Sequence, residues 1–255
     1  MEGSWRNEQY PPAADPFMSL RTLGSWLIGL LSLNAALDVV AAISDVSYLG
    51  LIERGKQGLV SFAEGSTADS RQANLALLQL LVFLVTAIVF IVWFRRAYRN
   101  LGPLGASWLR FKPGWATGGW FVPIFNAVRP KEIANDIWRV SDPDLPPALD
   151  GPALGRPVAP VVNLWWFAFI VSAALGRAAF RVDTDTLDQI ASATRLYLVG
   201  DVWDIFLSAL ALVVVKQITD RQERRWQLVS TARPAASQRP PGVPPPPPPP
   251  SAFGS

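Results

Sequence analysis

The sequence predicts an all-α integral membrane protein with four transmembrane helices, plus a short re-entrant or interfacial segment and an amphipathic helix in a cytoplasmic loop. Half of the 255 residues are hydrophobic and only 17% are charged, whereas about 25% of the residues of a soluble domain are charged. Four long apolar stretches divide the chain, and a shorter apolar stretch with an amphipathic pattern after it lies between the second and the third.

Each of the four long stretches can cross a bilayer as a helix. They cover residues 23–43, 73–94, 158–176 and 196–215. At about 1.5 Å of rise per residue, some 20 residues cross a hydrocarbon core of about 30 Å. Buried helices of a soluble protein are the poorer alternative, because these stretches lack the polar stripe that such a helix turns to water. We therefore expect a transmembrane domain over residues 20–230.

The first stretch is expected to be an uncleaved anchor rather than a signal peptide. The residues before it are polar and include Glu2, Glu8 and Asp15. The apolar run is also longer than the usual core of a signal peptide.

Lysine and arginine are distributed unequally between the segments that connect the stretches. The second loop carries nine, the N-terminal and C-terminal tails carry two and six, and the first and third loops carry three each. Because cytoplasmic loops retain positive charge, both termini and the second loop are predicted to be cytoplasmic, in a protein of the plasma membrane. Arg95, Arg96 and Arg99, directly after the second stretch, are the strongest local indication.

The second loop contains a segment, residues 115–140, that is not a plain linker. Residues 115–128 are apolar and aromatic but too short to span, and Gly118, Gly119 and Pro123 interrupt them. Beyond Pro130 the apolar residues recur at helical spacing, which predicts a short amphipathic helix at the inner surface. The alternative is a fifth pass over residues 115–138, which would place five charges in its second half and the basic C-terminal tail outside.

This loop strongly resembles the signature of a bacterial, mainly actinobacterial, family of multi-pass membrane proteins known as domain of unknown function 4328. The run FIVWFRRAYRNLGPLGASWLRFKPGWATGGWFVPIFNAVRPKEIANDIWRVSDP carries the resemblance. The resemblance implies a membrane location and the four-helix topology, but no activity. Its signature positions in the loop are Arg96, Arg99, Asn100, Trp115, Trp120, Pro123, Asn126, Arg129 and Pro130.

Charged side chains within the stretches are the candidate functional residues, because each costs about 2.5–3.5 kcal/mol on insertion scales. Asp38 lies in the first stretch, Asp201 and Asp204 lie in the fourth, and Arg177 closes the third on the same predicted outer side. One interpretation is structural, with the aspartates paired to Arg177 or capping backbone. The other is a proton or cation site. Gln79 and Thr86 in the second stretch are expected to form hydrogen bonds between helices.

Small residues in the third stretch form a smooth helix face. Ala168, Ser172 and Gly176 recur at four-residue spacing, which favours close packing within the bundle and, as a weaker option, a homo-oligomer.

Both tails are predicted to be disordered. Residues 1–19 are polar, and residues 231–255 are rich in proline, with seven consecutive prolines from 244 to 250 that favour polyproline II. A stiff spacer is one interpretation, and a docking segment for a partner protein is the other. Before this tail, the basic residues of 216–228 are expected to face anionic lipid headgroups.

The composition also excludes several chemistries. The sequence contains no Cys and no His, which removes disulfides, thiol catalysis and every mechanism that needs histidine. It has no phosphate-binding loop and no GxSxG elbow, so no cofactor, metal or nucleic-acid partner is expected. The sequence favours a non-enzymatic membrane scaffold or interaction module. The alternative is a small transporter or channel that uses the aspartates.

Overall fold

A computed structural model describes residues 10, 12, 16–146 and 155–237. The described residues are mostly helical and contain no β-strand. Most of the two tails predicted to be disordered, including the seven prolines, lies outside the described residues.

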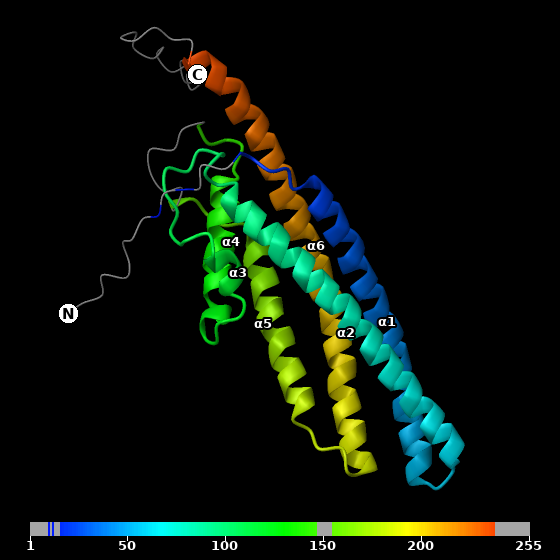
Figure 1. Ribbon diagram of the computed structural model, residues 1–255. Coiled ribbons are helices and arrows are strands. Elements are labelled where there is room, and N and C mark those ends of the chain that lie inside the picture. Colours follow the sequence, from blue (N-terminus) through cyan, green and yellow to red (C-terminus); the bar gives the residue numbers. More distant parts are fainter. Residues whose placement is uncertain (1–9, 11, 13–15, 147–154, 238–255) are drawn as a thin grey trace, which may run out of the picture.

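Four long helices form the body of the molecule (Figure 1). They are α1 (Arg21–Lys56), α2 (Phe62–Arg99), α5 (Pro160–Phe180) and α6 (Leu187–Ser237). Each is long and apolar enough to cross a membrane, and the chain is therefore a multi-pass membrane protein by length and composition. The four predicted stretches fall within these helices, apart from residues 158 and 159, which precede α5.

The connection between α1 and α2 is much shorter than the sequence suggested. The apolar stretches left residues 44–71 as an outer loop, but both helices continue into it, and only residues 57–61 connect them. Gly58 adopts a positive φ of 72° that closes the turn. Ser61 then caps α2 by accepting a hydrogen bond from the backbone N–H of Glu64. Polar residues also pair across the two helices here, as Arg54 does with Glu64.

Helix α6 is the centre of the arrangement, because α1 and α5 both pack along it, while α2 packs mainly on α1. Gly24 of α1 permits close approach: a Cβ at this position would lie 3.0 Å from the hydroxyl of Thr219 on α6. On the other side of α6, the Trp203 indole donates to the carbonyl of Ala168, 2.9 Å away. The small-residue face of α5 therefore packs within the bundle at Ala168.

Aromatic rings hold α2, α5 and the intervening loop together. The Trp120 ring lies edge-on to Phe90 and Phe94 of α2, each with a centroid distance of 5.5 Å. It also contacts Trp166 and Phe169 of α5, at 6.0 and 5.8 Å. Such pairs contribute about 0.5–1.5 kcal/mol each beyond the area that they bury, so this cluster fixes the loop against both helices.

The segment between α2 and α5 is folded, and its described residues contain no helix long enough to be a fifth pass. It contains α3 (Trp115–Gly118), the 3-10 turn η2 (Phe125–Ala127) and α4 (Arg129–Val140). The predicted amphipathic helix is α4, which has Pro130 in its first turn and buries Ile133 and Ile137. Gly119 makes the tight exit from α3 possible, since a Cβ there would lie 2.8 Å from the Trp115 carbonyl oxygen. We call residues 119–128 the α3–α4 turn.

The two ends of the bundle differ. The α4 end carries α4, the start of α1 and the end of α6, and the opposite end carries the α1–α2 and α5–α6 connections (Figure 1). At the α4 end, α6 continues well past the apolar stretch and organises other segments. Gln222 is fully buried, donates to the carbonyl of Ala97 and the hydroxyl of Ser141, and accepts from Asn100.

Arg225, one turn further along α6, is buried and binds four backbone carbonyls. Its guanidinium donates to Leu104 at 2.8 Å, Asp142 at 2.9 Å, Leu145 at 3.0 Å and Pro146 at 3.1 Å. Carbonyls in irregular loops have no ladder partners, and one planar guanidinium with five donors can satisfy several of them. Arg225 therefore holds the two halves of the α2–α5 connection together.

Arg225→Met should destabilise the protein by roughly 3 kcal/mol, because it leaves the buried carbonyl of Leu104 and three partly buried carbonyls without a donor. Thermal unfolding in detergent would measure the loss. The matched control is the neighbouring Arg224→Met, since Arg224 is exposed. Equal melting temperatures for the two variants would contradict the assigned role of Arg225.

Candidate functional site

Two polar groups are candidate sites: an acidic group inside the bundle and a charged cluster around α4. In the first, Gln79 of α2 joins aspartates of two other helices. Its side-chain amide nitrogen donates to Asp38 of α1 at 3.0 Å and to Asp201 of α6 at 3.1 Å. The predicted role of Gln79 as an interhelical hydrogen-bonding residue is confirmed.

The other two predicted residues of this group, Asp204 and Arg177, do not bond to Gln79. Asp204 lies near it, one turn along α6, and its Oδ1 atom is buried without a hydrogen-bond partner in the described part of the chain. Arg177 does not join the aspartates. It is exposed and donates to the carbonyl of Ala173 on its own helix, at 3.1 Å. The pairing of the aspartates with Arg177, one of the two structural roles considered for them, is therefore wrong, because Arg177 points away from the group.

Further polar contacts between α1 and α2 lie on either side of this group. Asn34 donates to the hydroxyl of Thr86 at 2.7 Å, as expected of Thr86. Towards the opposite end, Gln72 donates to Asp45 at 2.7 Å. The sequence analysis missed this pair because both residues lie outside the predicted apolar stretches.

A seven-residue spacing in the sequence contains the missing signal. Asp38 and Asp45 are seven residues apart in α1, as are Gln72, Gln79 and Thr86 in α2. Side chains at this spacing stay on the face that two helices share when they wrap around each other. The repeat therefore indicates a polar seam between α1 and α2, with an aspartate–glutamine pair at two successive levels.

The chemistry available to the acidic group is limited to hydrogen bonding and the binding of a proton or a cation. Within the described residues, no three acidic side chains come together in a way that could hold a metal ion. Carboxylates in a bundle interior require polar partners, and the amide of Gln79 supplies a hydrogen bond to Asp38 and to Asp201.

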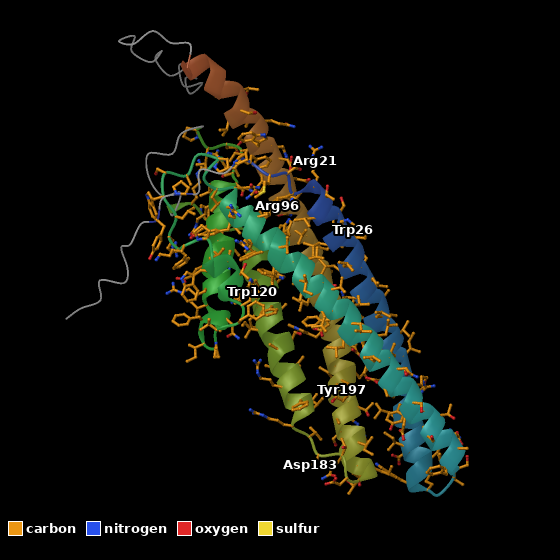
Figure 2. The ribbon with its side chains drawn as sticks, viewed as in Figure 1. Arg21, Trp26, Arg96, Trp120, Asp183 and Tyr197 are labelled. Carbon is orange, nitrogen blue, oxygen red and sulfur yellow. The ribbon has the colours of Figure 1, made fainter. Side chains whose placement is uncertain are left out.

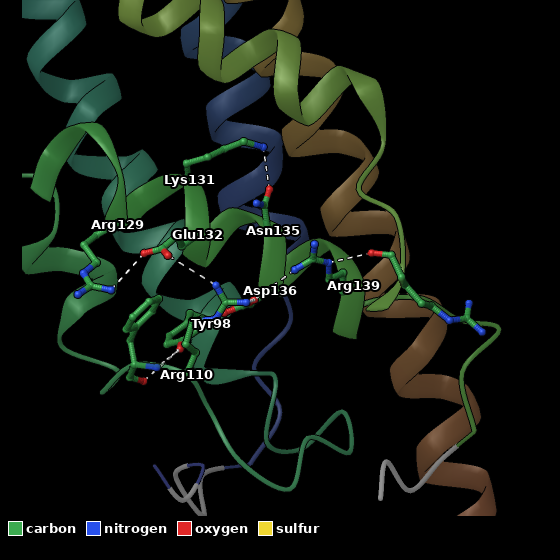
Figure 3. Close-up of polar contacts among 10 residues, drawn as sticks. Tyr98, Arg110, Arg129, Lys131, Glu132, Asn135, Asp136 and Arg139 are labelled. Atoms are coloured by element: carbon green, nitrogen blue, oxygen red, sulfur yellow. Dashed lines mark hydrogen bonds and ion pairs between the residues drawn. The ribbon is translucent and has the colours of Figure 1, made fainter. Parts of the chain in front are cut away.

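The second group lies on α4, where charges of opposite sign alternate (Figure 3). Arg129 pairs with Glu132 at 3.1 Å, Glu132 lies 3.7 Å from Arg110, and Arg110 lies 3.2 Å from Asp136. Arg139 follows at 3.9 Å from Asp136. The sequence places only Arg129 of these residues among the candidates, since Arg110 comes from the loop before α3.

The buried tyrosine Tyr98, in the last turn of α2, positions Arg110. Its hydroxyl donates to the carbonyl of Phe111 at 3.1 Å and accepts from the Phe111 N–H at 3.0 Å. This double contact fixes the backbone beside Arg110 and points its side chain to α4 (Figure 3).

Asp136 is the buried member of the cluster. Burial raises the pKa of its carboxyl to about 6, although Arg110 and Arg139 oppose the shift. Neither carboxylate oxygen has a hydrogen bond of good geometry within the described residues. Burying a carboxylate with so few partners is costly, and protonation relieves that cost.

Lys131 ties α4 to the start of α5. Its ammonium group donates to Asn135 and to Asn163, at 2.7 Å in each case. Burial lowers the pKa of Lys131 to about 8, with a smaller contribution from Arg139.

Arg129 joins α4 to the apolar segment before it. Its guanidinium lies 4.4 Å from the ring centroid of Phe111, 5.3 Å from that of Phe125 and 5.8 Å from that of Trp115. Cation–π contacts of this kind contribute about 0.5–2 kcal/mol. Arg129 therefore holds the two ends of the α3–α4 turn together.

The remaining signature residues connect the loop to the bundle. Asn100 accepts from the Met18 N–H at 3.0 Å and donates to the Met18 carbonyl at 2.8 Å. Arg96 donates to the carbonyl of Ser19, and Arg99 is the last residue of α2. Pro123 and Asn126 lie within the α3–α4 turn. The signature thus describes how this segment folds onto the bundle.

Asp136→Asn should remove a pH dependence of stability. The ordinary pKa of the carboxyl is 3.8 and its folded pKa is about 6, so its contribution is greatest at low pH and is lost as pH rises through about 6. The full effect is roughly 3 kcal/mol, at about 1.4 kcal/mol per pKa unit. Melting temperatures should fall for the wild type between about pH 4 and pH 6.5 and stay level over this range for D136N. The control is the exposed Asp144→Asn, and a D136N profile parallel to wild type would contradict the assignment.

Comparison with known proteins agrees with this placement of the signature. The sequence model of a family described as Domain of unknown function (DUF4328) matches residues 56–220, from the end of α1 to the middle of α6. No curated protein and no solved structure matches the chain. The match covers more than half of the chain and includes both candidate sites except for Asp38 and Asp45. The chain therefore belongs to the DUF4328 family.

Proposed function

We propose that the protein is a non-enzymatic scaffold or interaction module of the plasma membrane, with the α4 end and both termini in the cytoplasm. The observation that carries the proposal is the junction on α6 at the α4 end. Gln222 and Arg225 bind segments that are distant in the sequence: the end of α2, the loop before α3 and the residues after α4. Glu223 adds the start of α1, by accepting from the Leu20 N–H. By binding these segments, α6 arranges them into one folded surface at the α4 end, which we propose lies outside the bilayer.

The charge of this surface supports a partner with negative charge. Exposed arginines and lysines at the α4 end include Arg21, Arg95, Lys112, Arg156 and Arg224. Anionic headgroups of the inner leaflet attract such residues by about 1 kcal/mol each, and the same residues could bind an acidic protein. Retention of positive charge on the cytoplasmic side also supports the proposed orientation.

The remaining parts of the proposal concern partners and chemistry. The proline-rich tail is proposed to bind a partner protein, and a homo-oligomer is proposed as a further contact. Residues 115–140 are proposed to enter or lie on the inner leaflet. A catalytic role has little support, since the charged groups around α4 neutralise one another and the sequence has no His or Cys.

A transporter or channel is the second candidate, which the Gln79 bridge favours. Asp38, Gln79 and Asp201 bring polar groups of three helices together within the apolar stretches. Against it, the shallow hollow of about 520 Å³ beside α6 is lined only by Leu198, Val199, Val202, Trp203 and Phe206, and these apolar residues offer no path for an ion.

The scaffold proposal predicts that partners depend on charge at one end only. Proximity labelling from a C-terminal fusion in the native host would compare R95E/R224E with R177E/R195E, which reverses exposed charges near the opposite end. We expect a reproducible partner set that falls several-fold in the first variant and is unchanged in the second, at equal membrane levels. Equal partner sets in both variants would exclude the basic surface, and removal of residues 238–255 would test the tail separately.

The transporter candidate predicts flux that depends on the bridge. Protein in liposomes would be assayed for proton and monovalent-cation flux, with Asp201→Asn as the test variant and Asp69→Asn, distant in α2, as the control. Flux in wild type and D69N but not in D201N would support this candidate. Wild-type flux no greater than that of empty vesicles would exclude it.

A further inference from the structure

The α3–α4 turn exposes an apolar surface that the fold leaves without a partner. Its exposed side chains are Phe121 at 69%, Val122 at 38%, Ile124 at 83%, Phe125 at 41% and Val128 at 51%. Exposed apolar side chains that are clustered in this way mark a contact with lipid or with another protein. The turn lies beside α5, which Trp120 contacts through Trp166 and Phe169.

The contacts of Trp120 show how far the turn reaches along the bundle. Phe169 is the tenth residue of α5, and Phe90 lies nine residues before the last residue of α2. At about 1.5 Å per residue, both positions are roughly 14 Å from the helix ends at the α4 end. The turn beyond α3 descends beside α5 and ends level with its middle (Figure 1), and Trp120 lies on the side of the bundle (Figure 2).

Most backbone N–H groups of the turn have hydrogen-bond partners within the protein. The N–H groups of residues 121, 122, 125, 126, 127 and 128 all donate to carbonyls of residues 118 to 125. Pro123 has no N–H. Irregular backbone enters hydrocarbon only where its polar groups are satisfied within the protein, and this turn largely meets that condition.

The charges that border the turn match a phospholipid leaflet. Residues 113–128 contain no charged side chain, whereas Lys112 precedes them and Arg129 and Lys131 follow them. Lys131 contacts Asn163, in the first turn of α5. The cations therefore lie near the level at which α5 begins, and the apolar side chains lie deeper along it.

Ile124 occupies the tip with a φ of 69°. With a ψ of −50°, and with the Phe125 N–H donating to the Pro123 carbonyl, this residue forms a γ-turn with positive φ, a strained conformation that costs about 1–3 kcal/mol. Gly would adopt it at lower cost, so the position holds a large apolar side chain at the expense of local stability.

From these observations we propose that the α3–α4 turn is a re-entrant wedge that inserts Phe121–Val128 into the acyl region of one phospholipid leaflet, with Lys112 and Arg129 at the level of the phosphates. This deepens, and rests on, the proposed membrane scaffold. The wedge occupies one leaflet only, because the turn returns through α4 to the end from which it came. Its bound partner is the lipid itself.

Spin labels test the depth of the tip directly, because the natural chain has no Cys. Ile124→Cys and Val122→Cys place a label on the tip. Val85→Cys, half-exposed in the middle of α2, is the lipid reference, and Arg224→Cys is the water reference. Each labelled full-length protein is reconstituted in phosphatidylcholine–phosphatidylglycerol vesicles, and collision rates with oxygen and with a water-soluble nickel chelate are measured.

The proposal requires the two tip labels to resemble the label at 85, with a ratio of oxygen to nickel collisions at least several-fold above that at 224. Tip labels that match position 224, while 85 remains in lipid, would overturn the wedge and leave the membrane bundle and the scaffold proposal intact. A label at 85 that is accessible to nickel would instead contradict the membrane placement of the whole bundle. Two independent tip positions guard against disruption by either substitution.

Discussion

Hydrocarbon offers no hydrogen bonds, and this constraint accounts for most of the polar chemistry of the bundle. A carboxylate or amide in an apolar stretch must find its partner on a neighbouring helix. Gln79 supplies one to both Asp38 and Asp201, Gln72 supplies one to Asp45, and Asn34 supplies one to Thr86. These contacts recur at seven-residue intervals, so they also set the register of α1 against α2. Without them, apolar contacts alone would do little to fix the position of α1 along α2.

At the α4 end, buried side chains of α6 form their hydrogen bonds mainly with backbone carbonyls. The long connection between α2 and α5 includes irregular stretches before α3 and after α4, and α6 supplies donors to both through Gln222 and Arg225. The aromatic cluster around Trp120 then positions the segment against α2 and α5. These contacts fold the connection against the bundle. They also hold Arg110 in place beside the acidic residues of α4.

The sequence predicts the four helices, the short amphipathic helix and the hydrogen-bonding roles of Gln79 and Thr86, because apolar length and helical spacing are local properties. Pairing between distant segments was not accessible in the same way. Arg177 was expected beside the aspartates on the ground that it shares their end of the bundle, but helix rotation decides which side chains meet, and Arg177 faces outward. Arg110 and Asp136 come from a loop and a helix that only the fold brings together. The continuation of α1 and α2 past residues 43 and 73 was missed because polar helices are not marked by hydropathy.

Helix α6 runs without a break from Leu187 to Ser237. Between residues 187 and 233 it contains no proline and a single glycine, Gly200, so it has no hinge at which a bend would concentrate. At about 1.5 Å per residue it is roughly 76 Å long. A tilt or a sliding movement imposed near the α5–α6 connection is therefore carried as a rigid rod to Gln222 and Arg225. A displacement of the α5–α6 connection would thus move the loops at the α4 end directly, because one uninterrupted helix joins them.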